Sequence, residues 1–171
     1  MKFRNLLGYV VGSAIFLVFF PYLIWLVSQK FTFIIFENQI LPIVFSVPFL
    51  VLGAVYVALS NIQMKRMGKG NPADAFNVAI GERTKKLMTS GVYRHTRNPM
   101  LFGVFAFYIG IALFANSYAA LVFPAIFITY MSWHVKKIEE TRLLFDFGDE
   151  YEGYRCKTHY EIGRASCRER V

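Results

Sequence analysis

The charged residues of this chain stand in blocks, and the long stretches between the blocks carry no charge at all. No Asp, Glu, Lys or Arg occurs between Arg4 and Lys30, or between Glu37 and Lys65. A third charge-free stretch runs from Arg97 to Lys136. Because the hydrocarbon core of a bilayer is about 30 Å thick, about 20 apolar residues suffice for one helical crossing. The pattern therefore predicts an integral membrane protein.

The third charge-free stretch is about twice as long as one crossing needs, and the polar turn formers Asn116 and Ser117 lie near its middle. We therefore expect a tight hairpin of two helices in this stretch, because one unbroken helix of that length would fit neither a bilayer nor a soluble core. The fold class expected is all-α: a polytopic bundle of about four transmembrane helices. These helices are predicted near residues 5–29, 39–61, 100–115 and 118–135.

The composition supports this fold class and excludes two others. Hydrophobic residues make up 56% of the chain and aromatic residues 18%, which excludes a disordered protein. Charged residues make up only 18%, far fewer than a soluble nucleic-acid-binding protein carries. Membrane lipids are thus the expected surroundings, no nucleic acid is expected as a partner, and the sequence indicates no oligomeric state.

The distribution of Lys and Arg predicts how the bundle lies in the membrane. Lys2 and Arg4 precede the first predicted helix, and the first loop carries only Lys30 and Glu37. The loop over residues 61–97 carries eight basic and two acidic residues, a net charge of +6. Because basic loops stay in the cytoplasm, we expect both termini and this loop on the cytoplasmic side. In a prokaryote the membrane would be the cytoplasmic (inner) membrane; the endoplasmic reticulum is the alternative.

The last eleven residues, 161–171, differ in composition from everything before them. They are charged and small, without an apolar period. The run resembles what results when a sequencing-adapter oligonucleotide is read as coding sequence. We therefore expect one domain over residues 1–160, followed by a non-native tail.

Two segments outside the predicted crossings carry ordered patterns. The loop ends in the run from Lys85 to Gly103, in which Pro99 suits the first turn of a helix. The N–H groups at that helix start are candidates to bind a carboxylate. After the fourth helix, an amphipathic segment predicts a C-terminal surface helix. It begins with Glu139 and Glu140, and because adjacent carboxylates on a helix point in different directions, we expect one of them to face the bundle.

Together these segments resemble the isoprenylcysteine carboxyl methyltransferase family and its phospholipid N-methyltransferase relatives. The resemblance covers about the C-terminal half, residues 68–160. It rests on three motifs in order around a helical hairpin: Leu87-x-x-x-Gly91-x-Tyr93-x-x-x-Arg97-x-Pro99-x-x-x-Gly103, then Glu139-Glu140-x-x-Leu143, then Phe147-Gly-Asp-Glu-Tyr151-x-x-Tyr154.

The resemblance implies an integral membrane enzyme that uses S-adenosylmethionine without a Rossmann domain, and a lipid-like or small hydrophobic methyl acceptor. Glu139 would hold the ammonium of the cofactor, Tyr93 would stack on its adenine or face its sulfonium, and Arg97 is the candidate catalytic residue. By position, the implied cofactor contacts are Leu87, Met88, Tyr93, Asn98, Pro99, Met100, Leu101 and Glu139.

The chain departs from the family pattern at three positions. Asn98 stands where many members have His, and Leu101 where they have Tyr. The eukaryotic carboxyl methyltransferases direct an Arg to the substrate from the position of Val135. Lys136 or Lys137 is the candidate replacement for that Arg in substrate binding.

The expected chemistry asks little of the protein. The sulfonium is already activated, so the site has to align the acceptor and exclude water, and a carboxylate acceptor would need no general base. No metal is expected, because His95, His134 and His159 do not have metal-ligand spacing. Prenylated cysteine, a phospholipid amine, a small thiol and a hydrophobic metabolite all stay open as acceptors.

Two other functions fit the same layout. A membrane reductase of the sterol-reductase type has a similar C-terminal arrangement of helices but would need a nicotinamide cofactor. A non-catalytic membrane scaffold protein would retain the fold without the chemistry, and Leu101 and Val135 are the residues that favour this alternative.

Overall fold

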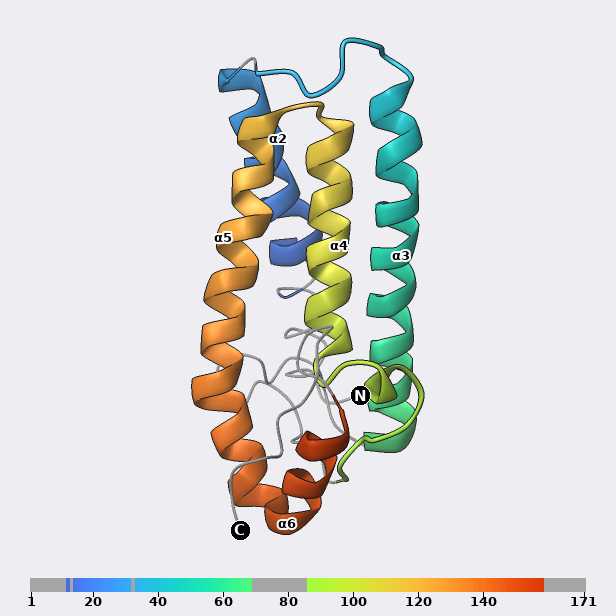
Figure 1. Ribbon diagram of the computed structural model, residues 1–171, viewed down its shortest axis with the longest axis vertical. Coiled ribbons are helices and arrows are strands. Elements are labelled where there is room, and N and C mark those ends of the chain that lie inside the picture. The colour runs from blue at the N-terminus through green and yellow to red at the C-terminus, as the bar shows by residue number, and fades with distance from the viewer. Residues whose placement is uncertain (1–11, 13, 32, 69–85, 159–171) are drawn as a thin grey trace.

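The computed structural model describes residues 12, 14–31, 33–68 and 86–158, and every element that it names in these ranges is a helix (Figure 1). The predicted all-α class is therefore confirmed for this part of the chain. The elements are η1 (Ile15–Phe19), α2 (Phe20–Lys30), α3 (Leu41–Gln63), η2 (Met64–Gly68), η4 (Gly91–Arg94), α4 (Pro99–Phe114), α5 (Tyr118–His134), η5 (Val135–Glu139) and α6 (Glu140–Lys157).

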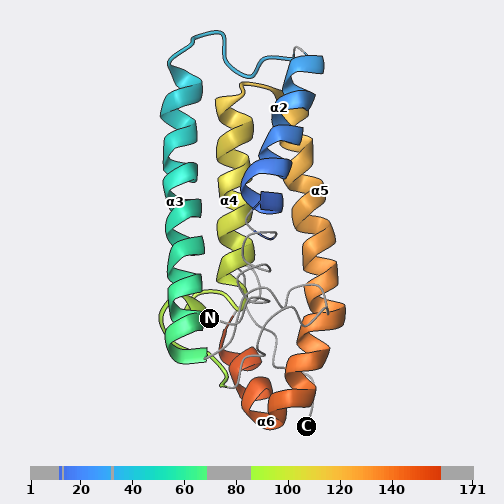
Figure 2. The ribbon, with the colours of Figure 1, turned by 180° about the vertical axis from the view of Figure 1, so that it is seen from behind.

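Four of these helices stand side by side. Helix α4 lies between α3 and α5, and α2 packs against α4 and α5, as the two opposite views in Figures 1 and 2 show. The predicted hairpin is present as α4 and α5, with its turn at Asn116. Helix α6 lies at the end of the bundle opposite that turn.

Two helical segments are long and apolar enough to cross a membrane. They are Leu41–Met67, which contains α3, and Tyr118–Lys157, which contains α5. Only 17% and 33% of their apolar windows are buried, so they are unlike core helices of a soluble protein. The apolar helices Ile15–Lys30 and Pro99–Phe114 are shorter, and the predicted start of the first span, near residue 5, lies outside the described residues. Four crossings therefore stay a prediction.

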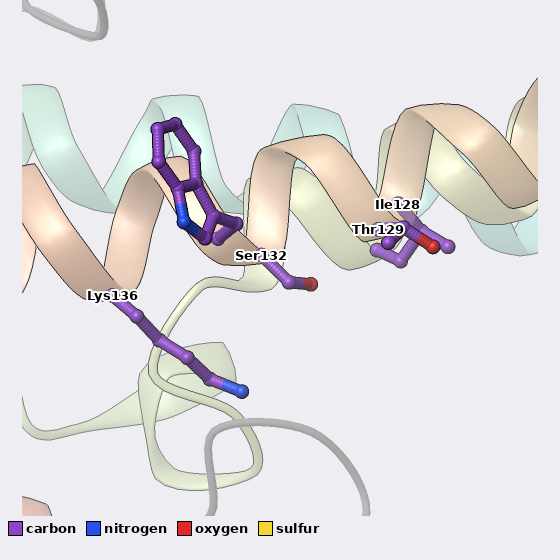
Figure 3. Close-up of a pocket in the computed structure, with 5 residues that line it drawn as sticks. Ile128, Thr129, Ser132 and Lys136 are labelled. Atoms are coloured by element: carbon purple, nitrogen blue, oxygen red, sulfur yellow. The ribbon is translucent and has the colours of Figure 1, made fainter.

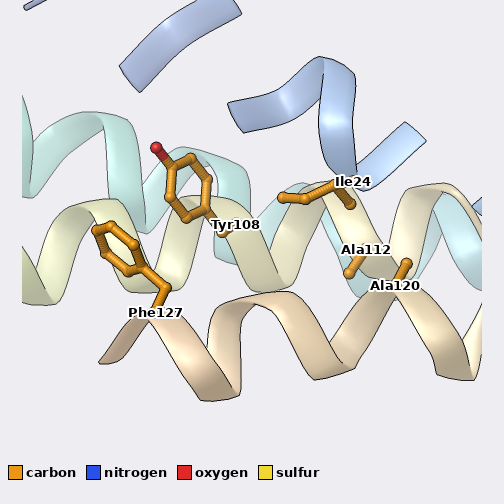
Figure 4. Packing of buried hydrophobic residues seen from close by; sticks show 5 residues of the cluster. All are labelled: Ile24, Tyr108, Ala112, Ala120 and Phe127. Carbon is orange, nitrogen blue, oxygen red and sulfur yellow. The ribbon is translucent and has the colours of Figure 1, made fainter. Parts of the chain in front are cut away.

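Aromatic rings pack against one another in the interior of the bundle. Figure 4 shows Tyr108 of α4 and Phe127 of α5 directed toward each other, and their ring centroids lie 5.1 Å apart in an edge-to-face arrangement. The hydroxyl of Tyr108 donates to the carbonyl of Phe16 at 3.0 Å, which joins α4 to η1. The buried members of this cluster are Ile24, Tyr108, Ala112, Ala120 and Phe127.

Helices α3 and α4 approach each other at glycines. A β-carbon at Gly53 of α3 would lie 2.6 Å from the backbone nitrogen of Phe107, and one at Gly103 of α4 would lie 2.9 Å from that of Val57. These distances are too short for any side chain, so the close contact requires glycine on both helices.

Asn116 fastens the hairpin turn to the loop that follows α2. Its φ of 50° is in the left-handed region, which Asn tolerates better than most residues. Its side-chain oxygen accepts from the N–H groups of Ile35 (3.2 Å) and Phe36 (2.9 Å), and its amide donates to the carbonyl of Phe36 at 2.8 Å. A single side chain thus satisfies three backbone groups of a segment about 80 residues away in the chain.

We expect Asn116→Ala to lower the free energy of unfolding by about 1–3 kcal/mol, because it removes the side-chain partner of the Phe36 N–H and of the Phe36 carbonyl. Asn116→Gly relieves the backbone conformation but not the lost hydrogen bonds, so it should recover only part of this loss. Asn38→Ala is the matched control, because the Asn38 side chain accepts from the Ile40 N–H at an exposed position. Chemical unfolding in detergent measures the free energy of unfolding of all three variants. Equal losses in Asn116→Ala and Asn38→Ala would contradict the stabilising role of the Asn116 hydrogen bonds.

Candidate active site

The end of the bundle opposite Asn116 brings together the end of α3, the turn η4, the start of α4 and helix α6. The sequence-predicted site residues Leu87, Met88, Tyr93, Arg97 and Glu139 all lie at this end. The loop residues 69–85 lie outside the described residues.

Tyr93 is held in place by α3. Its hydroxyl lies 3.0 Å from the hydroxyl of Ser60, and the N–H of its neighbour Val92 donates to the side-chain oxygen of Gln63 at 3.2 Å. Gly91 lies against the Gln63 side chain, so that a β-carbon there would overlap it. The Tyr93 side chain is buried, and η4 therefore has one fixed position on the end of α3.

Leu87 and Met88 are buried in two separate apolar clusters. Leu87 packs with Tyr151 and Tyr154 of α6. Met88 packs with Val92 and Tyr93, against Tyr56 of α3 and Met64 of η2. The two residues thus seat the segment before η4 on α6 and α3 respectively.

Helix α4 begins at Pro99, as its sequence predicted. The predicted donors for a carboxylate at this helix start are mostly taken, however. Pro99 has no N–H, the side chain of Asn98 accepts from the Leu101 N–H at 3.1 Å, and the Asn98 N–H donates to Thr96 at 3.3 Å. The Phe102 N–H bonds to the Asn98 carbonyl. At most the Met100 N–H is left for a ligand.

The remaining predicted contacts of this segment face different surroundings. Leu101 is half-buried and packs against the bundle core around Tyr108. Met100 and Asn98 are half-buried, whereas Pro99 is fully buried. Leu101 therefore belongs to the interior of the helical bundle, and Asn98 serves as the N-cap of α4.

Glu140 is the carboxylate that points into the bundle. Its Oε1 lies 2.8 Å from a terminal guanidinium nitrogen of Arg97, and the two side chains are only 8% and 13% exposed. Nε of Arg155, later in α6, lies 3.8 Å from the other carboxylate oxygen of Glu140. The prediction that one of the two adjacent glutamates faces inward is confirmed. Glu139, the residue implied as a cofactor contact, is half-buried beside it.

Helix α6 turns back toward η4 at Gly148. This residue has φ 48° and ψ −125°, a backbone conformation outside the helical region. Beyond it, the hydroxyl of Tyr154 donates to the backbone carbonyl of Tyr93 at 2.6 Å. A surface helix was expected here, and the structure shows why it folds back: its two tyrosines, Tyr151 and Tyr154, are buried against Leu87.

Three tyrosines at this end have altered acidity. Burial raises the pKa of Tyr93 to about 12; the hydrogen bond to Ser60 acts in the opposite direction, and the negative charge of Glu139 adds to the increase. Burial also raises the pKa of Tyr151 to about 12, with Glu140 adding and Arg97 opposing. Burial raises the pKa of Tyr154 as well. All three phenols are therefore neutral at physiological pH, and the Glu139 charge lies close enough to Tyr93 to act on it.

Lys136 and Lys137, the two tentative substrate-binding residues, lie in different surroundings. Lys136 lines a hollow in the wall of α5 together with Ser132 (Figure 3). The Nζ of Lys137 instead lies 5.0 Å from the centroid of the Trp133 ring. Among the histidines, His95 is exposed, His134 is buried, and His159 lies outside the described residues. The described residues contain no group of three His, Cys, Asp or Glu side chains placed to hold a metal.

Sequence reasoning selected Glu139 and did not assign roles to Glu140, Arg155, Tyr151 or Tyr154. The π-helical turn η5 sits directly before Glu140, and such single turns often occur at functional sites. No residue pattern marks a π turn in advance. The burial of Tyr151 and Tyr154 could have been predicted from the sequence, because a spacing of three residues places them on one face of a helix.

The described residues form an apolar helical bundle that is closed at one end by shielded Tyr, Arg and Glu side chains. The chain belongs to the phospholipid methyltransferase family, whose model matches residues 41–150. It is therefore a methyltransferase of the membrane type, and the relationship to phospholipid methyltransferases that the sequence motifs predicted is confirmed. Searches of curated proteins and of solved structures found no match.

We expect Gly148→Ala to lower the free energy of unfolding by about 1–3 kcal/mol, because only glycine adopts this backbone conformation without strain. A β-carbon at Gly148 would meet no atom within 4 Å, and the same is true of Gly153 in the same helix. Gly153→Ala is thus the matched control, and it should stabilise α6 by about 0.5–1 kcal/mol. Thermal unfolding in detergent compares the two variants. A Gly148→Ala variant as stable as the parent would mean that residue 148 does not require the positive-φ backbone conformation.

The tyrosines predict a loss of stability in alkali. Tyr93 and Tyr151 titrate near 12 in the folded protein and near 10 when unfolded. Their protons therefore contribute stability that is complete below about pH 10 and is lost as the pH rises through about 12. Tyr93→Phe should show a smaller decrease of the unfolding free energy across this window than the parent, and Tyr118→Phe, at an exposed position, should behave as the parent. If the unfolding free energy of Tyr93→Phe falls with pH as steeply as that of the parent, the raised pKa of Tyr93 is refuted.

Proposed function

We propose that this protein transfers a methyl group from S-adenosylmethionine to a lipid-like acceptor at the cytoplasmic face of a membrane, in the manner of the isoprenylcysteine carboxyl methyltransferases. Membership of the phospholipid methyltransferase family supports methyl transfer. The single observation that carries the site is that the charge of the half-buried Glu139 carboxylate is near enough to the buried Tyr93 to raise the pKa of its phenol.

The residues at this end suit the two ends of the cofactor. A carboxylate that is half shielded from water is a strong partner for the ammonium of a methionine group. The neutral ring of Tyr93 offers a surface for the sulfonium or for adenine. When bound, the cofactor supplies a methyl group that is already activated on sulfur, so a carboxylate acceptor needs no general base.

Arg97 takes a positioning role in this proposal, in place of the catalytic role first considered. Its guanidinium is paired with Glu140 at 2.8 Å and is largely shielded from solvent. The pair joins the residue two positions before α4 to the first residue of α6. Arg97 therefore fixes the position of Glu139, the neighbour of Glu140, relative to η4.

The proposed orientation has four membrane crossings with this end in the cytoplasm. The exposed basic residues Lys65, Arg66, Lys86 and Arg94 lie at this end, whereas the opposite end carries one Lys, at the end of α2, and one Glu in the loop that follows it. This asymmetry is what the positive-inside rule requires. The first and third crossings would be made by the shorter helices α2 and α4, with α4 enclosed between α3 and α5.

Calorimetry with the purified full chain in detergent tests the cofactor site. We expect the parent protein to bind S-adenosylmethionine and Glu139→Gln to bind it about 10–100-fold more weakly, because a hydrogen-bonded charge is lost. Glu150→Gln, an exposed position on α6, is the matched control and should bind as the parent does.

Two results would contradict the proposal. One is that the folded parent binds no S-adenosylmethionine; the other is that Glu139→Gln binds it as tightly as Glu150→Gln. Competition with a nicotinamide cofactor separates the methyltransferase from a reductase, because only a reductase would retain the nicotinamide. Labelled S-adenosylmethionine, incubated with membranes that contain the protein, then identifies the methylated acceptor.

A further inference from the structure

Ser60 is a buried residue of α3 whose hydroxyl bonds outside its own helix. None of its surface is exposed, and its Oγ lies 3.0 Å from the hydroxyl of Tyr93, 33 residues later in the chain. Hydroxyl residues within other helical turns behave differently: Ser28, Ser46 and Thr129 donate to carbonyls three or four residues earlier in their own helices. The Ser60 hydroxyl is therefore used to hold η4 against the end of α3.

The hydrogen bond between these two hydroxyls is shielded from water at both ends. Ser60 is fully buried and Tyr93 is only 7% exposed. In such surroundings a hydrogen bond is stronger than in water, and a buried hydroxyl that loses its partner is costly. The Tyr93 ring is therefore kept from swinging away from Ser60.

The main chain of Tyr93 is fixed by other contacts. The hydroxyl of Tyr154 donates to its carbonyl at 2.6 Å, and the side chain of Gln63 accepts from the N–H of Val92 at 3.2 Å. Both ends of the residue are thus held: the main chain by α6 and α3, and the phenol oxygen by Ser60. With both ends held, the ring can only rotate about its own long axis, and Ser60 decides where that axis points.

The surroundings of Tyr93 indicate which part of the proposed cofactor its ring would meet. The negative charge of Glu139 acts on the Tyr93 phenol, in addition to the larger effect of burial. Glu139 is the residue proposed to hold the ammonium, which belongs to the methionine part of the cofactor together with the sulfonium, whereas adenine lies beyond the ribose. The ring therefore suits the sulfonium, because an aromatic ring attracts a cation and not a neutral thioether.

We infer that Ser60 is a positioning residue of the proposed cofactor site: its hydroxyl holds the Tyr93 ring where the ring recognises the sulfonium of S-adenosylmethionine. The inference rests on the proposed function and deepens it. It gives the site a means of distinguishing the cofactor from its demethylated product, S-adenosylhomocysteine, which carries no charge on sulfur. A residue of α3, outside the three sequence motifs, thereby contributes to cofactor specificity.

Calorimetry with both compounds and the full chain in detergent tests this role. We expect Ser60→Ala to bind S-adenosylmethionine about 3–10-fold more weakly than the parent and S-adenosylhomocysteine within about twofold of the parent, because only the cation–π contribution is lost. Ser46→Ala is the matched control. Ser46 is also fully buried in α3, but its hydroxyl bonds within its own helix, so both affinities should equal those of the parent.

A second variant breaks the same hydrogen bond from its other end. Tyr93→Phe retains the ring and removes the hydroxyl that Ser60 holds. We expect it to weaken S-adenosylmethionine binding as Ser60→Ala does, and the double variant to lose no more than either single variant, because all three lack the same bond. Tyr93→Phe also decides the question if Ser60→Ala does not fold.

Three results would overturn the inference. The first is a Ser60→Ala protein with a lowered melting temperature but parent-like affinities, which would make Ser60 purely structural. The second is weakened binding in Tyr93→Phe alone, which would place the Tyr93 hydroxyl itself on the cofactor. The third is an equal loss of affinity for both compounds in Ser60→Ala, which would mean that the ring does not recognise the sulfonium.

A failure of the proposed function gives a different pattern. If the folded parent binds neither compound, the cofactor site itself is refuted and the role of Ser60 falls with it. If the parent binds S-adenosylmethionine and Ser60→Ala binds it equally well, the cofactor site stands and only the role of Ser60 is overturned.

Discussion

The end of the molecule that holds the proposed site depends on the ion pair between Arg97 and Glu140. It joins the start of α4 to the start of α6 at 2.8 Å, with both side chains largely shielded from water. Shielding two charges costs solvation, and removing one partner from such a pair leaves the other buried and uncompensated, which costs about 3–5 kcal/mol. The pair therefore acts as a constraint on how α6 sits beneath the bundle.

The other contacts between α6 and the segment before α4 depend on the ion pair between Arg97 and Glu140. Once Glu140 is fixed, Gly148 lets the rest of α6 return, and Tyr154 reaches the backbone of Tyr93. Tyr151 and Tyr154 then cover Leu87. The segment before α4 and the segment after α5, which are distant in sequence, form one unit in this way.

Local chemistry allowed part of this to be predicted from the sequence. Pro99 and the polar pair at Asn116 mark the start of α4 and the hairpin turn because a missing N–H and a left-handed backbone are properties of single residues. The capping role of Asn98 is typical of its residue type, although the family motif implied only a cofactor contact for this residue. The cap explains why the start of α4 has few donors left for a ligand, a point that the helix-dipole argument alone overlooked.

The orientation of the two glutamates could not be predicted, because it depends on a π turn. The turn η5 inserts one extra residue before Glu140, and each residue rotates the helix by about 100°. Which of two adjacent side chains faces the bundle is thus decided by a single backbone hydrogen-bond shift. The return of α6 likewise depends on packing between Leu87 and two tyrosines more than sixty residues later, which no local pattern contains.

Helix α5 continues through η5 to Glu139 without a loop. The carboxylate proposed to hold the cofactor is therefore carried on the same continuous helix that begins, at the other end of the bundle, beside the hairpin turn bonded by Asn116. A shift of that turn along the helix axis would move Glu139 with it, so the hydrogen bonds of Asn116 help to set the position of a side chain at the opposite end of the bundle.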